Sequence, residues 1–402
     1  MRILFVLDFY GLFGNPSSGA SNRNTLFVQA LTELGHVDVC SFSNEAIVSD
    51  IEDCDVVYSN QISYLREKRN KYVRSLHSLL QMSVSPTNPY AFYKVCKQRE
   101  AIVDELVKRN NYDIVACRYI SSAIRCGLLK YSSRLVVDID DNPGNNIRNI
   151  AATSNSFLLK TKLNYTAKRI PKMVERVLDG VFCSFYSNML EPHSSTSVFL
   201  HNSALCAANV PDISCTIPNK LLFVGLLSYP PNKYGITHFV NNIYPMIRQR
   251  VPDVELHIIG KGDQSMLIEL NNIGGGIKAP GFVDDIVAEY EAAKVVVIPI
   301  YHGSGTCIKF VEGMFMNRPV VSTPVGARGF DRIAEDNVHY SLAKDDEDFV
   351  NKTVDLLLNT QKANEMANKA YELAKNNFSQ EKFIEIVKET IETKLKQKQT
   401  KV

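Results

Sequence analysis

The chain of 402 residues lacks the sequence features of several large protein classes. Its 45 basic and 43 acidic residues leave a formal net charge of only +2, so the total charge does not indicate nucleic-acid binding. Its nine cysteines include no CxxC pair, and Cys117 and Cys183 lie in apolar runs that are typical of strands. This usage argues against a disulfide framework or a zinc site and favours reduced, buried thiols in a cytosolic protein.

Membrane-spanning, targeting and dinucleotide-binding signals are also missing. No apolar run approaches the ~20 residues that a membrane-spanning helix needs. Residues 1–10 predict a first strand rather than a signal peptide, because they carry one positive charge and no small-residue cleavage site. The glycine- and serine-rich loop at 11–21 lacks GxGxxG spacing, which argues against a dehydrogenase. A length of 402 residues, 45% hydrophobic and 22% charged, predicts two or three globular domains with sizeable cores.

The most informative stretch that is present runs from residue 294 to residue 328. A β-branched run, Val295 to Ile298, predicts a buried parallel strand. The glycine-rich loop HGSGT follows at 302–306, and apolar residues at helical spacing predict a helix directly after it. Asn317 suits the left-handed position that closes a helix, and Pro319 prevents the helix from continuing into the next strand.

This strand–loop–helix unit has the chemistry of a phosphate site. Free backbone N–H groups at a helix N-terminus favour an anion, and glycines let a phosphate approach closely. Glu312 lies about two turns into the helix, beside apolar Val311, and core packing explains it poorly. It is well placed to accept hydrogen bonds from sugar hydroxyls. Spacing alone leaves open a tight turn followed by a solvated glutamate.

The same segment resembles the nucleotide-sugar site of family 4 retaining glycosyltransferases. Their pattern is a glycine-rich loop, a lysine, Glu-Ala-Met, and Pro-Val-Val-Ser-Thr-x-x-Gly-Ala. The matching residues here are Gly303, Ser304, Gly305, Thr306, Lys309, Glu312, Gly313, Met314, Pro319, Val320, Val321, Ser322, Thr323, Gly326 and Ala327. Many members carry two glutamates with seven residues between them. Glu312 matches the second, and Ser304 stands where the first would be, as in a polysaccharide-type branch.

The rest of the chain reads as two successive α/β halves. Strands are predicted at 2–7, 37–41, 56–59, 114–118, 135–137, 181–184, 198–200, 220–224, 254–259, 295–298 and 320–321. Helices are predicted at 23–34, 99–109, 122–130, 236–250, 286–292, 346–358, 362–376 and 379–395. With the resemblance, this order implies the α/β GT-B fold, in which two Rossmann-like doubly wound domains face each other across a cleft. The predicted domains are 1–202 and 220–378, with a linker at 203–219 and the helix 379–395 returning to the first domain.

The resemblance also implies which residues bind the donor. Loops after the strands of the second half would hold the phosphates near Gly225 and the base near residues 281–283. Many members have an arginine shortly after this first glycine, but Leu226 follows it here, so Lys233 or Lys261 would supply the phosphate charge instead. A solvated surface lysine is the open alternative for each. The full predicted donor-binding set is Gly19, Gly225, Lys261, Gly281, Phe282, Val283, Gly303, Ser304, Gly305, Thr306, Lys309 and Glu312.

Catalytic residues are predicted in both halves: Glu312, and, where the resemblance places the acceptor, Arg118 and Asp140. Loop capping is the open alternative for the aspartates at 138–141. The 303–306 amides would stabilise the departing nucleoside diphosphate. The predicted donor loops carry no Asp-x-Asp pair, so neither a metal nor a cofactor is expected. Front-face attack would retain the anomeric configuration without an enzyme base.

The predicted function is transfer of a sugar from a nucleotide diphosphate sugar to a glycan or lipid-linked acceptor in cell-surface polysaccharide or glycoconjugate synthesis. A nucleotide-sugar 2-epimerase, a PLP-dependent phosphorylase and a non-catalytic nucleotide-sugar-binding or assembly protein stay open as alternatives. Two basic stretches, Arg66–Arg74 and Lys160–Arg176, predict docking of a cytoplasmic enzyme on an anionic membrane surface. Ordinary solvated helix faces are the alternative.

Overall fold

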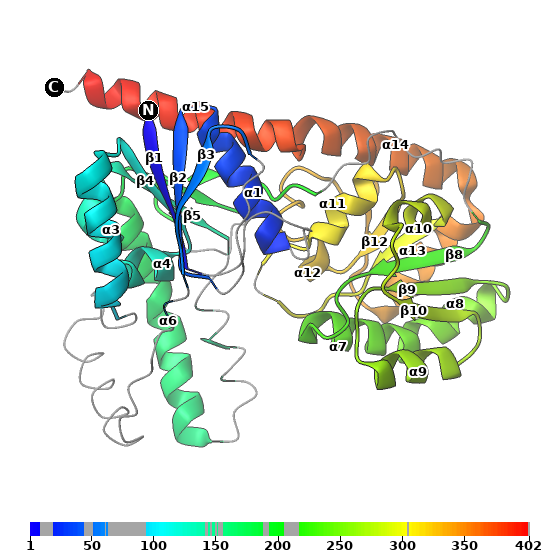
Figure 1. The fold of residues 1–402 in the computed structure, drawn as a ribbon. Helices are drawn as coiled ribbons and strands as arrows, with labels where there is room; N and C mark the ends of the chain where they lie inside the picture. Colours follow the sequence, from blue (N-terminus) through cyan, green and yellow to red (C-terminus); the bar gives the residue numbers. More distant parts are fainter. Residues whose placement is uncertain are drawn as a thin grey trace. The chain divides into compact units, whose positions relative to one another are not determined.

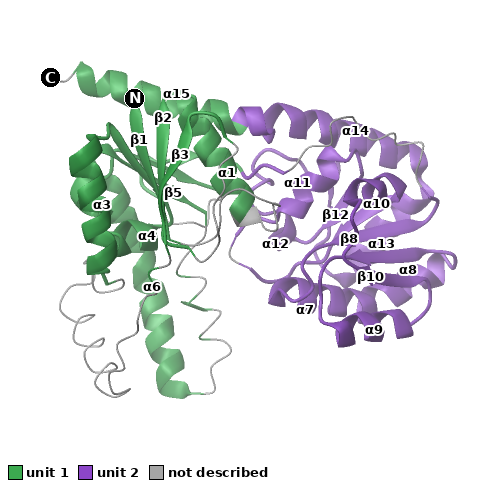
Figure 2. Ribbon diagram, in the orientation of Figure 1, with its two compact units in different colours: residues 1–201, 383–402 green, residues 202–382 purple. Residues whose placement is uncertain are grey.

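The computed structural model describes residues 1–8, 19–43, 51–60, 62, 94–140, 144, 147–148, 151, 156–187, 193–204, 217–303 and 305–400 (Figure 1). They form two compact units, unit 1 (residues 1–201 and 383–402) and unit 2 (residues 202–382) (Figure 2). The predicted linker at 203–219 lies mostly outside the described residues, and the basic stretch Arg66–Arg74 lies wholly outside them.

The sheet of unit 1 has seven parallel strands in the order β3-β2-β1-β4-β5-β6-β7. They are β1 (Arg2–Leu7), β2 (His36–Ser41), β3 (Cys54–Ser59), β4 (Ile114–Arg118), β5 (Leu135–Ile139), β6 (Cys183–Tyr186) and β7 (Val198–Phe199). Every residue of β4 and β5 is buried, as expected for central parallel strands covered on both faces. Because the sheet grows outward from β1 in both directions, the predicted doubly wound arrangement is confirmed.

The helices of unit 1 are α1 (Gly19–Thr32), α3 (Lys97–Asn110), α4 (Ile120–Arg125), the 3₁₀ helix η2 (Leu128–Arg134), α6 (Phe157–Asp179) and most of α15 (Gln380–Gln399). The predicted helix at 122–130 was wrong in extent. It ends at Arg125, because Gly127 adopts a left-handed φ of +71° and the chain continues as η2. α15 brings Phe383, Val387 and Ile391 into the core of unit 1.

The sheet of unit 2 has six parallel strands in the order β10-β9-β8-β11-β12-β13. They are β8 (Lys220–Val224), β9 (Glu255–Ile259), β10 (Ile277–Gly281), β11 (Val295–Ile298), β12 (Val320–Ser322) and β13 (Ser341–Leu342). The two edge strands, β10 and β13, were not predicted from the sequence. β10 buries only alternate residues and contains Pro280, and β13 is two residues long, so neither gives a strong apolar signal.

The helices of unit 2 are α7 (Pro230–His238), the π turn η4 (Phe239–Ile243), α8 (Tyr244–Arg250), α9 (Gln264–Asn272), α10 (Ile286–Ala292), α11 (Ile308–Phe315), α12 (Pro324–Ala327), α13 (Asp346–Leu358) and α14 (Thr360–Asn377). The predicted helix at 236–250 begins six residues earlier, where Pro230 fits a first turn. It passes through η4 before Pro245, which has no N–H for the helical ladder.

Local residues set the helix ends in unit 2, as the sequence predicts for α11. α11 follows the glycine-rich loop directly, and Asn317 closes it with a φ of +51°. Asp285 caps α10 by accepting a hydrogen bond from the Ala288 N–H at 3.0 Å. Ser379 accepts one from the Lys382 N–H at 3.1 Å, at the start of α15.

The described cysteines fit the predicted reduced state. All seven are free, and five of them are buried. Burial raises the pKa of the Cys183 thiol to about 12. Among the described helices, none is both long enough and apolar enough to cross a membrane.

Candidate active site

The glycine-rich loop of unit 2 links β11 to α11. Gly303 has a φ of +142°, which side-chain-bearing residues rarely adopt. Arg328, at the end of α12, donates from Nη2 to the carbonyl oxygens of Gly303 and Gly305 at 2.9 Å each. Arg328 therefore fixes the backbone of the loop on both sides of Ser304, which itself lies outside the described residues.

Glu312 is half-buried on α11 and accepts a hydrogen bond from the Tyr290 hydroxyl at 3.2 Å. Tyr290 comes from α10 and is 1% exposed. Burial raises the pKa of Glu312, and this outweighs the opposite effects of Lys309 and of the Tyr290 hydrogen bond. A carboxylate offers about four acceptor positions. Within the described residues Tyr290 is its one hydrogen-bond partner, so most of this capacity is available to a ligand.

Lys309 is held beside Gly225 by a buried amide. Its Nζ donates to Oδ1 of Asn232 at 2.8 Å, and Nδ2 of Asn232 donates to the Leu226 carbonyl at 2.9 Å. A Cβ on Gly225 would lie 2.8 Å from Asn232 and 3.2 Å from Nζ of Lys309, so any side chain there would disturb the pair. Lys309 forms no ion pair within the described chain, so its charge is not neutralised there by a carboxylate in contact.

The remaining predicted donor loops come together at the same edge of the sheet. Gly260 packs so closely against Gly225 that a Cβ would lie 2.0 Å from the Gly225 carbonyl oxygen. The Gly260 N–H donates to the Gly281 carbonyl at 2.8 Å. Next to them, Nζ of Lys261 lies 5.0 Å from the centre of the Phe282 ring, which is 62% exposed. Lys261 is thus a second cation at this edge, resting on an aromatic face.

Two further predicted donor residues have mainly internal contacts. The Thr306 hydroxyl accepts a hydrogen bond from Nδ2 of Asn202, and Val283 packs against the core of unit 2. In unit 1, Gly19 is the first residue of α1. The structure brings Gly225, Lys261, Phe282 and the start of α11 to the carboxyl ends of the unit 2 strands, where ligands of doubly wound sheets bind.

The predicted residues of the first half lie in a buried ion-pair network at the ends of β4 and β5. Nε and Nη2 of Arg23 donate hydrogen bonds to the two carboxylate oxygens of Asp138, both at 2.7 Å. Nε of Arg118 lies 3.2 Å from Oδ2 of Asp138, and Arg118 also forms an ion pair with Asp140. Its Nη1 donates a hydrogen bond to Oδ1 of Asn24 at 2.6 Å. Arg118 is 2% exposed, whereas the Asp140 side chain is 15% exposed. The network accounts for both residues structurally, and their catalytic roles stay predictions.

Several residues that shape these sites were not predicted from the sequence. Asn232 and Tyr290 hold Lys309 and Glu312, and Arg328 directly follows the matched Gly-Ala pair. In unit 1, Tyr119 follows Arg118 with a φ of +66°, a strained conformation for a residue with a side chain. Of these, only Arg328 carried a sequence signal, since it adjoins the motif.

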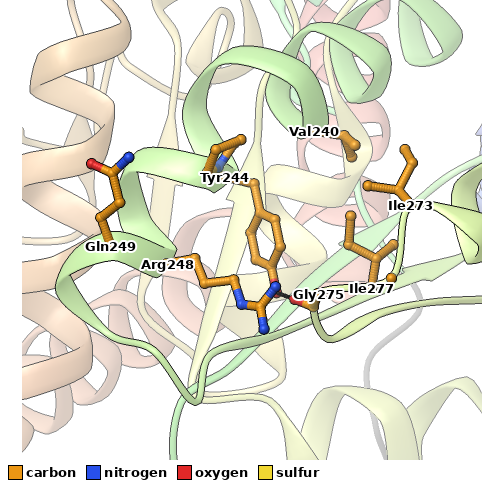
Figure 3. A pocket seen from close by; sticks show the side chains of 9 residues that line it. Val240, Tyr244, Arg248, Gln249, Ile273, Gly275 and Ile277 are labelled. Carbon is orange, nitrogen blue, oxygen red and sulfur yellow. Dashed lines mark hydrogen bonds between the residues drawn. The ribbon is translucent and has the colours of Figure 1, made fainter.

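A surface pocket of about 330 Å³ lies elsewhere in unit 2, between α8 and the turn before β10. Its lining includes Tyr244, whose hydroxyl donates to the Gly275 carbonyl at 2.8 Å, and Arg248 (Figure 3). The turn precedes β10, so the pocket lies at the amino ends of the strands, opposite the edge that carries the glycine-rich loop. It is therefore not part of the candidate donor site.

Comparisons with known proteins bear on the family and on the fold. Residues 218–359 match the family described as glycosyl transferases group 1. A Klebsiella pneumoniae protein described as an uncharacterized 44.6 kDa protein in the cps region is 26% identical over 179 residues, which cover 42% of this chain and 45% of that relative. The chain thus matches less than half the length of this relative.

Solved structures show the same fold at low identity. A glycosyltransferase from Rickettsia africae aligns with a TM-score of 0.65 and 15% identity over 98% of each chain. HepE from Anabaena, in complex with UDP, aligns with a TM-score of 0.60 and 15% identity over 98% of this chain and 100% of that one. The chain therefore has the GT-B fold of these structures, and the family match to glycosyl transferases group 1 covers residues 218–359.

Proposed function

We propose that the protein transfers a sugar from a nucleotide diphosphate sugar to a glycan or lipid-linked acceptor, with retention of anomeric configuration. The observation that carries the proposal is the start of α11. There, Lys309 is oriented by a neutral amide and Glu312 by a neutral hydroxyl, both directly after a glycine-rich loop. The lysine cation can bind the diphosphate of a nucleotide sugar, and the carboxylate has unused hydrogen-bond acceptor positions for the hydroxyls of the ribose.

The residues take complementary roles in this proposal. Lys309 and the loop amides stabilise the charge that develops on the departing nucleoside diphosphate, and they are fixed before the reaction begins. Glu312 accepts hydrogen bonds from the ribose hydroxyls. Phe282 and the backbone of Gly281 flank the base. The leaving phosphate takes the acceptor proton, as in front-face attack, so no enzyme base is assigned.

UDP is the first nucleotide to test, because the HepE structure was determined in complex with UDP. In a thermal-shift assay of wild type with UDP-, GDP- and other nucleotide sugars, the sugars of one nucleotide base should raise the melting temperature. Lys309→Ala should lose this shift, whereas Lys344→Ala, which removes an exposed lysine of unit 2, should keep it. An equal shift in wild type and Lys309→Ala would contradict the assignment of the donor site.

Transfer itself is tested by incubating the enzyme with the matching donor and candidate acceptors. Nuclear magnetic resonance of the product then gives its anomeric configuration, which we expect to be that of the donor. Epimerised donor in the absence of acceptor would instead indicate the epimerase alternative. Acceptors should be drawn first from capsule-type glycans, because the Klebsiella pneumoniae relative is described as lying in the cps region.

We further propose that unit 1 docks reversibly on an anionic membrane surface through the start of α6. Phe157 and Leu158 are 79% and 80% exposed at the first turn of this helix. Exposed basic residues follow along the helix: Lys160, Lys168, Lys172 and Arg176. Apolar side chains that enter the headgroup layer beside cations are typical of interfacial helices. A cytoplasmic enzyme would then meet lipid-linked acceptors at the inner face of the membrane.

Vesicle co-sedimentation tests the membrane proposal. Wild type should bind anionic vesicles at low salt and release them at high salt, because each basic residue near the surface contributes about 1 kcal/mol. The double variant Phe157→Ser, Leu158→Ser should lose most of the binding while keeping the melting temperature. Binding that ignores lipid charge, salt and these side chains would overturn the proposal.

A further inference from the structure

Three side chains of metal-binding type gather near the amino-terminal edge of the sheet in unit 1. His36 and Asp38 are two residues apart on β2, so they share one face of the sheet. The parallel register pairs Asp38 directly with Asp55 on the neighbouring β3. The candidate ligand atoms of the three residues all lie within 4.8 Å of one another. Two adjacent strands therefore fix the cluster, not a loop.

One imidazole nitrogen faces both carboxylates. Nε2 of His36 lies 3.1 Å from Oδ1 of Asp38 and 3.3 Å from Oδ2 of Asp55. A single N–H cannot point well at two acceptors. A tetrahedral zinc ion, with bonds of about 2.0–2.1 Å, holds its ligand atoms about 3.3 Å apart. We propose that His36, Asp38 and Asp55 bind a divalent transition-metal ion, zinc in the first place, with water completing its coordination.

Asp38 is already oriented as a metal ligand would be. Its side chain is 2% exposed, and its Oδ2 accepts hydrogen bonds from the Tyr112 hydroxyl at 2.6 Å and from Nη2 of Arg2 at 3.0 Å. These contacts leave Oδ1 facing His36. Outer partners of this kind fix ligating carboxylates in metal sites. The Arg2 charge lowers the affinity, so we expect an exchangeable site and not a permanently occupied one.

The site is distinct from the candidate donor site and does not depend on the proposed function. His36 is the first residue of β2 in unit 1, whereas the candidate donor site lies on unit 2 at the carboxyl ends of its strands. β3 is an edge strand of the unit 1 sheet. A metal ion bound to both β2 and β3 would hold the edge strand β3 against the sheet. Its predicted role is therefore to stabilise unit 1.

Equilibrium dialysis of the full chain against zinc chloride, followed by elemental analysis, tests the proposal. Wild type should bind one more zinc ion per chain than His36→Ala or Asp55→Ala, and zinc should raise its melting temperature more. Glu52→Ala is the matched control, because it removes a neighbouring exposed carboxylate outside the cluster. Tyr112→Phe keeps all three ligands but should weaken binding roughly tenfold or more.

Two results would overturn the metal site. One is zinc content and a thermal shift that are the same in wild type, His36→Ala and Asp55→Ala, because any zinc would then be bound elsewhere. The other is no saturable zinc binding by wild type, which would leave a histidine hydrogen-bonded between two carboxylates. The control Glu52→Ala should keep the extra zinc ion, because it leaves all three ligands in place.

Discussion

The two units both place charged residues at the carboxyl ends of parallel strands, but they surround these charges differently. In unit 1, Arg23 and Arg118 share Asp138, and all three are at most 2% exposed. In unit 2, Lys309 and Glu312 are half-buried, and each is held by a neutral partner within the described chain. Charges that neutralise one another stabilise a fold, whereas charges held by neutral groups are available to a ligand.

This contrast separates a structural role from a role in ligand binding, which residue type alone cannot distinguish. Arginine and aspartate after a strand suggest catalysis as readily as lysine and glutamate do. Burial and the charge of the partner decide between them. On this criterion the network of unit 1 has a structural role, and the start of α11 is the better candidate for donor binding.

The largest expected effect comes from breaking the unit 1 network. Asp138→Asn leaves two buried guanidinium groups facing an uncharged amide, so unit 1 should lose about 3–5 kcal/mol of stability. Urea unfolding, with each unit followed separately, measures this loss. The control Asp284→Asn changes an exposed aspartate of unit 2 and should have little effect. Unaltered unfolding of Asp138→Asn would mean that the network is not structural.

At Glu312, the expected loss is in activity and not in stability. Glu312→Ala should reduce kcat/KM at least about 30-fold, which corresponds to ~2 kcal/mol of transition-state stabilisation, because a charged hydrogen bond to the donor is lost. Turnover within twofold of wild type, in a folded variant, would remove Glu312 from the site.

Stability should respond to Glu312 in the opposite direction from activity. Because burial raises the pKa of Glu312, the folded protein binds this proton more tightly than the unfolded chain does. The contribution of this carboxyl group to stability is full at low pH and is lost as the pH rises through its folded pKa. Glu312→Gln should therefore raise the free energy of unfolding at neutral pH, and the gain should vanish in acid.

A smaller effect is expected from the partner of Lys309. Asn232→Ala removes one hydrogen bond to the ammonium group of Lys309. The fall in kcat/KM should correspond to a loss of about 1–2 kcal/mol in transition-state stabilisation. Asn241→Ala, at an exposed position of η4, serves as the control. If both variants lose activity equally, the amide does not orient Lys309.

The smallest effect is expected from Tyr290→Phe. The tyrosine hydroxyl lowers the pKa of Glu312, so its removal should move the acid limb of the kcat/KM profile to higher pH. At the pH optimum the loss should be about 1 kcal/mol or less. Tyr340→Phe changes another buried tyrosine of unit 2 and should leave the acid limb in place. An unshifted limb in Tyr290→Phe would show that this carboxyl group does not limit activity in acid.

How far the sequence predicts these features depends on how local they are. β11, the glycine-rich loop and α11 were predicted because all the information lies within residues 294–328. Tyr290 looks like an ordinary apolar position of α10, and only packing shows that its hydroxyl meets Glu312, 22 residues later. Arg23 and Asp138 are 115 residues apart, so neither residue type nor spacing indicates their pairing. The His36 cluster likewise depends on strand register, which periodicity does not supply.

The position of α15 has a consequence for the order of folding during synthesis. Unit 2 is one continuous segment, residues 202–382, whereas unit 1 takes Phe383, Val387 and Ile391 from beyond that segment into the same cluster as Phe27 (Figure 2). On the ribosome, domains usually complete in order from the N-terminus. Here the unit that is translated first lacks part of its apolar core until translation has passed unit 2. Newly made unit 1 therefore exposes that apolar surface during most of its synthesis and closes it last.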